Sequence, residues 1–418
     1  MFIIIVLAAI LGAPLFTVIA SSALTGFHSL NVSLTSVAIN IYQLTDTQML
    51  PAIPLFTLAG YLMSESGAPN RLVNLSRAFL GWMPGGLSIV ALISCAIFTA
   101  FTGASGVTII ALGGLLLPAM ISEGYSEKFA LGLVTTAGAL GLLFPPSLPP
   151  ILYGIISKVS IDHLYRAGLL PGILMVVLLS AYSVVVSKRA RVPTTRFNVK
   201  AAIKSAREAI WEIPLPFVIL GGIYSGKFAV GDAAVVTAAY TLIVEVFIYR
   251  EIPLAKLPTL LRETVVLVGG VLIIVSVSLA STNYMLDAQI PVKIAEFTLR
   301  YISSPLTFLI VMNIFLLLIS CLLDIFSHIV IVLPLLLPVA QNYNINPVHL
   351  GVIFLANLQI GYCMPPFGMD LFIASYRFNK PILMLFRVTI PFLILLLITV
   401  LIITYWPELS LFLLRYGK

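Results

Sequence analysis

Long apolar runs alternate with short polar connections from one end of the chain to the other. Runs of about 20 apolar residues are long enough to cross a bilayer as helices. They recur throughout, and the most polar stretch, residues 188–212, lies near the middle. The pattern predicts an all-α polytopic membrane protein with two halves, 1–187 and 213–418, joined by a basic linker.

Composition agrees with this prediction. The chain is 60% hydrophobic and 9% charged, with a mean hydropathy of +1.11, whereas soluble domains carry about 25% charged residues. The net charge of +7 does not indicate nucleic-acid binding, because the basic residues lie in short loops between apolar runs, as cytoplasmic loops do. The three cysteines are isolated and indicate neither a disulfide framework nor a metal site.

Four further segments complete the pattern. Residues 1–27, interrupted at Gly12–Pro14, predict one kinked span or two short ones, and residues 28–48 a loop or an interfacial helix. Asn70–Trp82 carries Arg71 and Arg77 among apolar residues, which favours an amphipathic surface helix over a solvated loop. Leu385–Tyr405 is expected to be the last helix of the chain.

The two halves share a repeat at a constant offset of 220 residues. A shared offset over several proline and glycine positions indicates duplication more strongly than matches between leucines do. The matching segments are Leu115–Pro118 with Leu335–Pro338, Gly141 with Gly361, and Pro145-Pro146 with Pro365-Pro366.

Charge predicts opposite orientations for the two copies. The loops 188–212 and 250–262, and the loop containing Arg377, Lys380 and Arg387, are basic and therefore cytoplasmic. The broken helix 127–158 then runs outward, while its counterpart 348–378 runs inward. Inverted repeats of this kind are typical of secondary transporters.

The two proline pairs interrupt apolar spanning segments. Non-helical backbone inside a bilayer persists where it is buried in protein or lines a polar cavity, so we expect the site at these breaks. Pro145 is expected to begin a second half-helix with Ser147 in its first turn. The carbonyls of Ala139–Phe144 would be free to bind a cation, and the amide end of the half-helix would face an anion. A plain proline kink that serves packing is the alternative.

Two nearly uncharged segments, 84–121 and 305–341, precede the broken helices and predict re-entrant helical hairpins. The first tip is expected at Thr102–Ser105 and the second near Asp324 and Ser327-His328. Asp324 lies in an otherwise apolar run, which makes it a functional candidate, or else a cap that accepts from backbone amides. His328 and His349 are expected to be structural.

At these positions the chain resembles the large membrane subunit of tripartite ATP-independent periplasmic (TRAP) transporters over nearly its whole length. The resemblance implies an elevator-type importer, similar to the ion transporter superfamily, that is driven by Na⁺. It also implies three partners: a separate small four-helix membrane subunit, a periplasmic substrate-binding protein and an organic anion as substrate. The motifs that carry the resemblance include Ile53–Phe56, Gly85–Leu87, Pro145–Ser147, Tyr153-Gly154, Pro171-Gly172, Gly221–Ile223, Asn346–Val352, and Gly361 with Pro365-Pro366.

The candidate site residues lie at the two tips and the two breaks. Asn357 and Gln359 lie one to two turns before the second Pro-Pro pair, and their side-chain carbonyls could turn toward the break. The candidates for substrate binding are Thr102, Gly103, Ser105, Ser147, Ser327, Asn357 and Phe367. The candidates for sodium are Gly103, Ser105, Gly138, Gly141, Pro145, Asp324, Gly361 and Pro365.

Two other functions compete with this one. A sodium-coupled carboxylate carrier that works without a binding protein would share the repeat and the hairpins. An intramembrane serine protease would use Ser105, in Gly103–Gly106, with His328 as base, but it would leave the repeated Pro-Pro break unexplained. We therefore expect a multi-pass transporter, not an enzyme, in the inner membrane of a bacterium or archaeon.

Overall fold

The computed structural model describes residues 13–43, 50–193, 197–302 and 304–416, together with residues 5, 7, 8 and 11. These residues form helices and connecting loops, and no strand occurs among them. Six of the described helices are long and apolar enough to cross a membrane, or seven spans if one bent pair counts as a span. The chain is therefore a polytopic, all-helical membrane protein, as its sequence predicts.

The N-terminal region packs on one long helix. The helices α2 (Leu15–Ser29) and α3 (Thr35–Gln43) both contact α14 (Leu257–Asp287), where Phe27 meets Tyr284 edge to face. Residues 28–48 thus include a helix. Whether residues 1–27 form one span or two depends on positions that lie partly outside the described residues.

The first half continues from α4 (Ala52–Glu65) and the amphipathic helix α5 (Ala68–Leu80) into a pair of helices, α6 (Gly86–Thr102) and α7 (Ser105–Ser122). We call the joint between α6 and α7, Gly103–Ala104, the first tip. The half then continues through α8 (Glu127–Ala137), the 3-10 turn η2 (Leu140–Leu143), α9 (Leu148–Ser157) and α10 (Ile161–Arg189).

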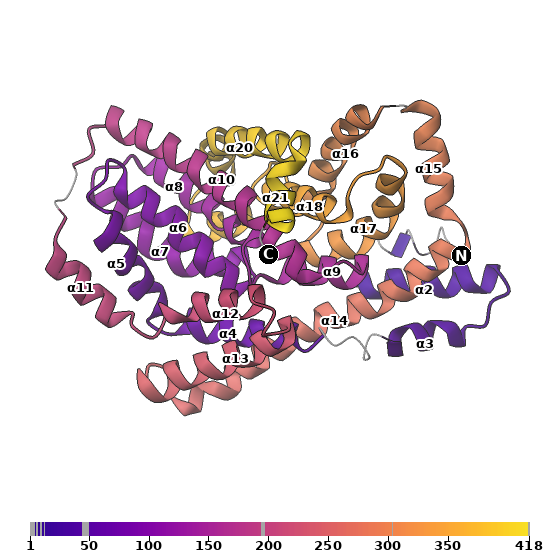
Figure 1. Cartoon of the computed structure of the whole chain (residues 1–418), viewed down its shortest axis with the longest axis horizontal. Coiled ribbons are helices and arrows are strands. Elements are labelled where there is room, and N and C mark those ends of the chain that lie inside the picture. Colours follow the sequence, from indigo (N-terminus) through magenta and orange to yellow (C-terminus); the bar gives the residue numbers. More distant parts are fainter. Residues whose placement is uncertain are drawn as a thin grey trace.

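The second half has a matching order. The second tip, Cys321–Asp324, joins α16 (Pro305–Ser320) to α17 (Ile325–Asn342), and α18 (Pro347–Gly361) is followed by α19 (Met369–Phe378). In Figure 1 the pair α6–α7 lies on the left, the pair α16–α17 on the right, and α9 and α18 between them. The other elements are α11 (Val199–Glu208), α12 (Pro214–Tyr224), α13 (Val230–Leu242), the π-turn η3 (Ile243–Ile248), η4 (Leu254–Lys256), α15 (Ile290–Tyr301), α20 (Ile382–Tyr405) and α21 (Pro407–Tyr416).

The C-terminal end differs from the sequence-based expectation. Leu385–Tyr405 is not the last helix, because α21 follows it after Trp406 and packs on α10, α18 and α20. Leu411 and Ser410 of α21 are buried. Pro407 at the first position and Glu408 in the first turn suit a helix start, and the contacts with α10 and α18 stabilise the helix.

A buried ion cluster anchors α5. The guanidinium of Arg71 hydrogen bonds to Glu212, to Glu245 at 3.0 Å and to Glu251 at 2.5 Å. It also lies 3.9 Å above the ring of Tyr249. Burial lowers the pKa of Arg71, but hydrogen bonds and attraction from the three carboxylates outweigh burial and hold that pKa above its usual value. The cluster ties the amphipathic helix to the linker end and to η3.

Candidate functional site

The first tip is a tight connection between two buried helices. Gly103 caps α6 with φ 65°, and its N–H donates to the carbonyl of Thr99 at 2.8 Å. A Cβ at Gly103 would lie 2.7 Å from Cγ of Leu148, the first residue of α9. Only glycine combines this positive φ with such a close approach. The tip therefore packs directly on the start of the half-helix after the first break.

The first break, residues 138–147, bends the segment by 42° between α8–η2 and α9. Pro145 does not begin the half-helix, contrary to the sequence-based prediction. Ser147 is the N-cap and α9 begins at Leu148, because Pro149 and Pro150 lack N–H groups and fit the first turn best. Ser147 therefore lies before the helix, where its hydroxyl donates to the Leu142 carbonyl at 2.6 Å.

Several carbonyl groups of the first break already accept hydrogen bonds, whereas the sequence predicted that they would be free to bind a cation. Those of Ala139, Gly141 and Phe144 accept from backbone N–H groups within the break, and the Leu142 carbonyl accepts from Ser147. Gly138 accepts from Thr99 Oγ1 at 2.7 Å, and this hydroxyl lies 2.6 Å from that of Thr108. A carbonyl oxygen has two lone pairs, so each retains capacity for a cation.

The two breaks are held by close backbone contact with the first helix of each pair. A Cβ on Gly141 would lie 2.4 Å from both Ala100 N and Ala96 O of α6. A Cβ on Gly361 would lie 2.1 Å from Cβ of Ser320, the last residue of α16. Both glycines thus occupy equivalent positions in the packing of their own half.

The second tip is capped by its own carboxylate. Asp324 is the N-cap of α17, and its side chain accepts from Phe326 N at 3.1 Å, from Ser327 N at 3.3 Å and from the Ser327 hydroxyl. Its side chain is exposed. Asp324 thus forms the helix cap that the sequence offered as the alternative to a sodium-binding role. Its oxygen atoms accept from backbone N–H groups at the start of α17.

Asp370 brings the two halves together. This fully buried carboxylate, in the first turn of α19, accepts a 2.6 Å hydrogen bond from Ser105 Oγ at the start of α7. Its own N–H donates to the Tyr362 carbonyl at 3.0 Å, and the Tyr362 hydroxyl accepts from Ile325 N at the second tip. Hydrogen bonds through the second break, residues 362–368, thus connect one tip to the other.

No cationic side chain neutralises Asp370 among the residues that the structure describes. Its side-chain hydrogen-bond partners in this part of the chain are the Ser105 hydroxyl and, at 3.7 Å, the Cys363 thiol. A buried carboxylate without a counter-charge is strongly unfavourable unless a cation or a proton joins it. The oxygen atoms around Ser105, Thr108 and Gly138 are the ligand type that sodium takes in broken-helix transporters, so the residues present fit a monovalent cation.

The remaining candidate residues lie at the first tip, in the second break and in a contact between two helices. Thr102 is buried at the first tip, and its hydroxyl lies 3.4 Å from the Ala104 carbonyl. Phe367 is 58% exposed in the second break, near Pro365 in the chain. Asn357 is not part of either tip, because its amide donates to Asn313 of α16 at 2.7 Å and to the Ile353 carbonyl at 2.8 Å.

Asp370 was not singled out as a site residue from the sequence, whereas Gln359 was expected to turn toward the second break. Asp370 is the only charged residue between Leu350 and Tyr376 and closely follows a Pro-Pro pair, a signal that could have identified it. Gln359 is fully buried one turn before the second break, and neither atom of its amide has a partner in the structure. An amide buried without partners is rare, and it adds polar capacity beside the break.

The protease geometry is not formed. The Ser105 hydroxyl donates to Asp370, while Nδ1 of His328 lies 3.1 Å from Ser320 Oγ. A serine nucleophile needs its base within hydrogen-bond reach. Polytopic helices, paired helical tips and interrupted spans that meet around a buried carboxylate define a membrane transporter.

The comparisons identify the family. Residues 1–409 match the family model described as "Tripartite ATP-independent periplasmic transporter, DctM component", and the chain belongs to this family. It is 35% identical to the C4-dicarboxylate TRAP transporter large permease protein DctM of Pseudomonas aeruginosa, over 91% of this chain and 89% of that protein. It is 32% identical to the ectoine/5-hydroxyectoine TRAP transporter large permease protein UehC of Ruegeria pomeroyi, over 97% and 95%.

Solved structures share the fold. The YdaH transporter of Alcanivorax borkumensis superposes with a TM-score of 0.61 at 15% identity, over 90% of this chain and 88% of that one. MtrF of Neisseria gonorrhoeae gives 0.63 at 13% identity, over 89% and 83%. The relatives are named as transporter permeases, so this chain is a transporter subunit and not an enzyme.

Proposed function

We propose that this chain is the large membrane subunit of a sodium-coupled importer of a small organic acid, working by an elevator mechanism in a bacterial or archaeal inner membrane. The relatives named for C4-dicarboxylates and for ectoine support a small organic acid as substrate. The words "tripartite" and "periplasmic" in the family name support two further components. We expect these to be a periplasmic binding protein that delivers the substrate and a separate small four-helix membrane subunit.

The observation that carries the proposal is that each half packs one helix of its pair on the half-helix of the other half. Helix α7 packs along α19, and α17 packs on α9, while α6 contacts η2 and α16 contacts α18. In each half, the first helix of the pair therefore packs on the break of the same half. The second helix of the pair packs on the half-helix that follows the break of the other half. This reciprocal arrangement is what two inverted modules with re-entrant hairpins would form around one shared site.

Sodium and the substrate would occupy different parts of this site. Asp370, Ser105 and the Gly138 carbonyl supply oxygen atoms and negative charge for the cation at the first tip. The N-terminal end of α9 supplies positive dipole for the carboxylate of the substrate. Bound sodium adds positive charge beside that carboxylate, which the site otherwise lacks.

Uptake by the reconstituted complex tests the proposal. The chain, the small subunit and the binding protein in liposomes should take up a labelled organic acid only with an inward sodium gradient. Full-rate uptake without sodium would overturn the coupling. Equal uptake with and without the binding protein would favour the carrier that needs none.

Cysteine labelling tests the inverted orientation separately. Ser122 and Asn342 are exposed ends of α7 and α17 at the same repeat offset, while Cys95, Cys321 and Cys363 are buried. In intact cells an impermeant maleimide should label Asn342→Cys, and Ser122→Cys only after permeabilisation. Labelling of both from one side would overturn the inverted topology.

A further inference from the structure

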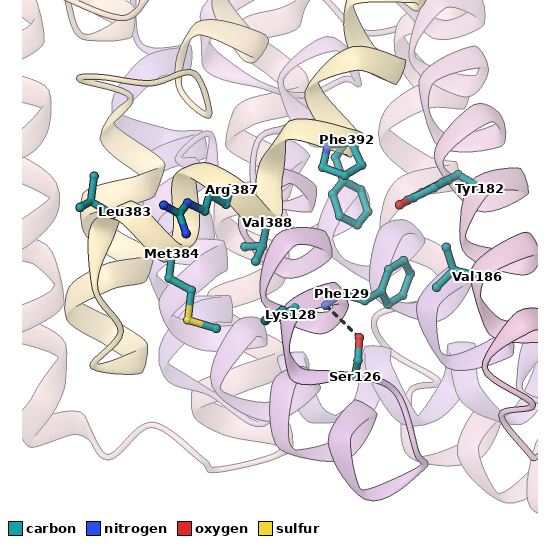
Figure 2. A pocket seen from close by; sticks show the side chains of 11 residues that line it. Ser126, Lys128, Phe129, Tyr182, Val186, Leu383, Met384, Arg387, Val388 and Phe392 are labelled. Atoms are coloured by element: carbon teal, nitrogen blue, oxygen red, sulfur yellow. Dashed lines mark hydrogen bonds between the residues drawn. The ribbon is translucent and has the colours of Figure 1, made fainter.

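A cavity lies apart from the tips and breaks. It has a volume of about 580 Å³ and opens between the start of α8, the end of α10 and the start of α20. In Figure 2, Lys128 and Phe129 come from α8, Tyr182 and Val186 from α10, and Arg387 from α20. The basic loops beside these helix ends place the cavity on the cytoplasmic side.

The floor of the cavity is aromatic. Phe129, Tyr182 and Phe392 come from three different helices, and their ring centroids lie 5.4–6.1 Å apart. Beside this floor α8 and α20 approach closely, since a Cβ on Gly132 would lie 2.3 Å from the Val388 carbonyl. The floor therefore joins the first half of the broken span to α20.

The rim of the cavity is cationic. Lys128 and Arg387 are both exposed, and neither forms an ion pair with any described residue. The nearby Lys380 differs, because its ammonium pairs with Glu127 at 2.6 Å. Two positive charges from two helices, neither in an ion pair, thus line the same cavity as an apolar wall that includes Leu383, Met384 and Val388.

We propose that this cavity binds an anionic phospholipid of the cytoplasmic leaflet. The phosphate would lie between Lys128 and Arg387, where arginine can form two parallel hydrogen bonds to phosphate oxygens. One acyl chain would follow the apolar wall down to the aromatic floor. Basic pockets between membrane helices on the cytoplasmic side have this chemistry. The lipid would hold α8 against α20.

The amphiphilic lining favours a lipid over a free anion. A dicarboxylate or inorganic phosphate would satisfy the two cations but leave the apolar wall and the aromatic floor in contact with water. An acyl chain covers that surface and gains from its removal from water. A lipid also arrives from the bilayer in which the rim already lies.

Native mass spectrometry of the purified full chain tests the site. With phosphatidylglycerol added, we expect a retained lipid adduct and a higher unfolding temperature, while phosphatidylcholine and inorganic phosphate give neither. Lys128→Gln/Arg387→Gln should weaken phosphatidylglycerol binding by roughly tenfold or more, given the attraction of each basic residue to anionic lipid. Protection by inorganic phosphate equal to that by phosphatidylglycerol would overturn the lipid assignment.

Two further variants separate the effect of the positive charges on lipid binding from the effect of the apolar wall. Lys200→Gln/Arg207→Gln removes the same charge from exposed positions of α11 and should leave lipid binding unchanged. Leu383→Trp keeps both cations but fills the apolar wall from an exposed position, and it should reduce lipid retention. Wild-type retention in both Leu383→Trp and Lys128→Gln/Arg387→Gln would refute the proposal.

Discussion

Asp370 presents a simple electrostatic problem. Its carboxylate is fully buried, and its hydrogen bonds come from a hydroxyl and a thiol. Neither partner carries positive charge, so the carboxylate is stable as an anion only beside a bound cation. In the proposed transporter that cation is the coupling sodium.

Asp370→Asn should therefore weaken sodium binding. Asparagine keeps the shape of the side chain and an oxygen that accepts from Ser105, but it removes the charge. Loss of one charged ligand contact of about 1.5–3 kcal/mol corresponds to roughly tenfold or more in sodium affinity. The sodium concentration for half-maximal uptake, and the rise of the unfolding temperature with sodium, both measure this.

Asp287→Asn is the matched control for this change. Asp287 is the exposed last residue of α14, and it lies outside both breaks. Its substitution should change neither measurement. An Asp370→Asn protein with wild-type sodium dependence would show that the cation binds elsewhere.

Gly103→Ala tests the contact at the first tip. Alanine with positive φ costs about 1–2 kcal/mol, and its Cβ would also overlap Leu148, an overpacking that costs about 1–3 kcal/mol. Gly226→Ala is the control, because Gly226 has φ 71° but nothing lies within 4 Å of its Cβ position. Thermal unfolding should show a larger loss for Gly103→Ala, and Leu148→Ala in the same protein should recover part of it. Equal losses at both glycines would exclude the contact.

The side-chain contacts of the site were the part of the structure that the sequence predicted least well. Ser105 was expected at the site from its place at a tip, but its partner Asp370 lies 265 positions away in the chain. Only the fold joins them. Asp324 stood out because its neighbours are apolar, yet it caps its own helix, which is what a carboxylate before an apolar helix commonly does.

At the scale of elements, the two breaks depend on glycines that let backbones touch. Gly141→Ala places a methyl group against the backbone of α6, and Gly361→Ala places one against Ser320. Neither neighbour is a flexible side-chain end, so each change should cost about 1–3 kcal/mol by overpacking. Both variants should lose transport together with thermal stability.

Gly221→Ala provides the comparison within the same chain. Gly221 lies in α12 with nothing within 4 Å of a Cβ. Alanine there should be neutral or gain up to about 1 kcal/mol from helix propensity. If Gly141→Ala matched Gly221→Ala in stability and uptake, the break would not depend on close contact with α6.

The ion cluster on α5 gives a second element-scale prediction. Arg71→Ala leaves Glu212, Glu245 and Glu251 together without their guanidinium, and loss of one partner from a buried pair costs about 3–5 kcal/mol. Arg77→Ala removes an exposed pair with Glu123 from the same helix, worth under about 1 kcal/mol. Unfolding temperatures should separate the two variants clearly. Similar losses would mean that Arg71 is compensated by its surroundings.

Most of the helices could be predicted from the sequence. Apolar runs, glycines and proline pairs are local signals, and they predicted helices at α6, α7, α16 and α17 with joints near Gly103 and Asp324. The start of α9 was misplaced at Pro145 because two proline pairs, 145–146 and 149–150, compete for the first turn. The final helix, α21, was missed because its stability comes from packing on α10.

At the scale of the whole molecule, the net charge moved in each transport cycle decides the driving force. The site has helix amide ends and oxygen donors, and no cationic side chain contacts Asp370 in the described part of the chain. In the proposed mechanism, bound sodium supplies the positive charge beside the carboxylate of the substrate. Two breaks related by pseudo-symmetry make two sodium ions the expected minimum, so a monoanion would enter with net positive charge.

Import should therefore respond to voltage as well as to sodium. Each net charge that moves inward gains about 2.3 kcal/mol per 100 mV of interior-negative potential. In liposomes with a fixed sodium gradient, a potassium diffusion potential set by valinomycin should accelerate uptake of a monoanion when the interior is negative and slow it when the interior is positive. The Asp370→Asn protein is the informative variant, because a weakened sodium site should reduce this voltage response at limiting sodium. An uptake rate that does not change with the potential would mean that the charges of sodium and substrate cancel. The prediction of two sodium ions per monoanion would then be wrong.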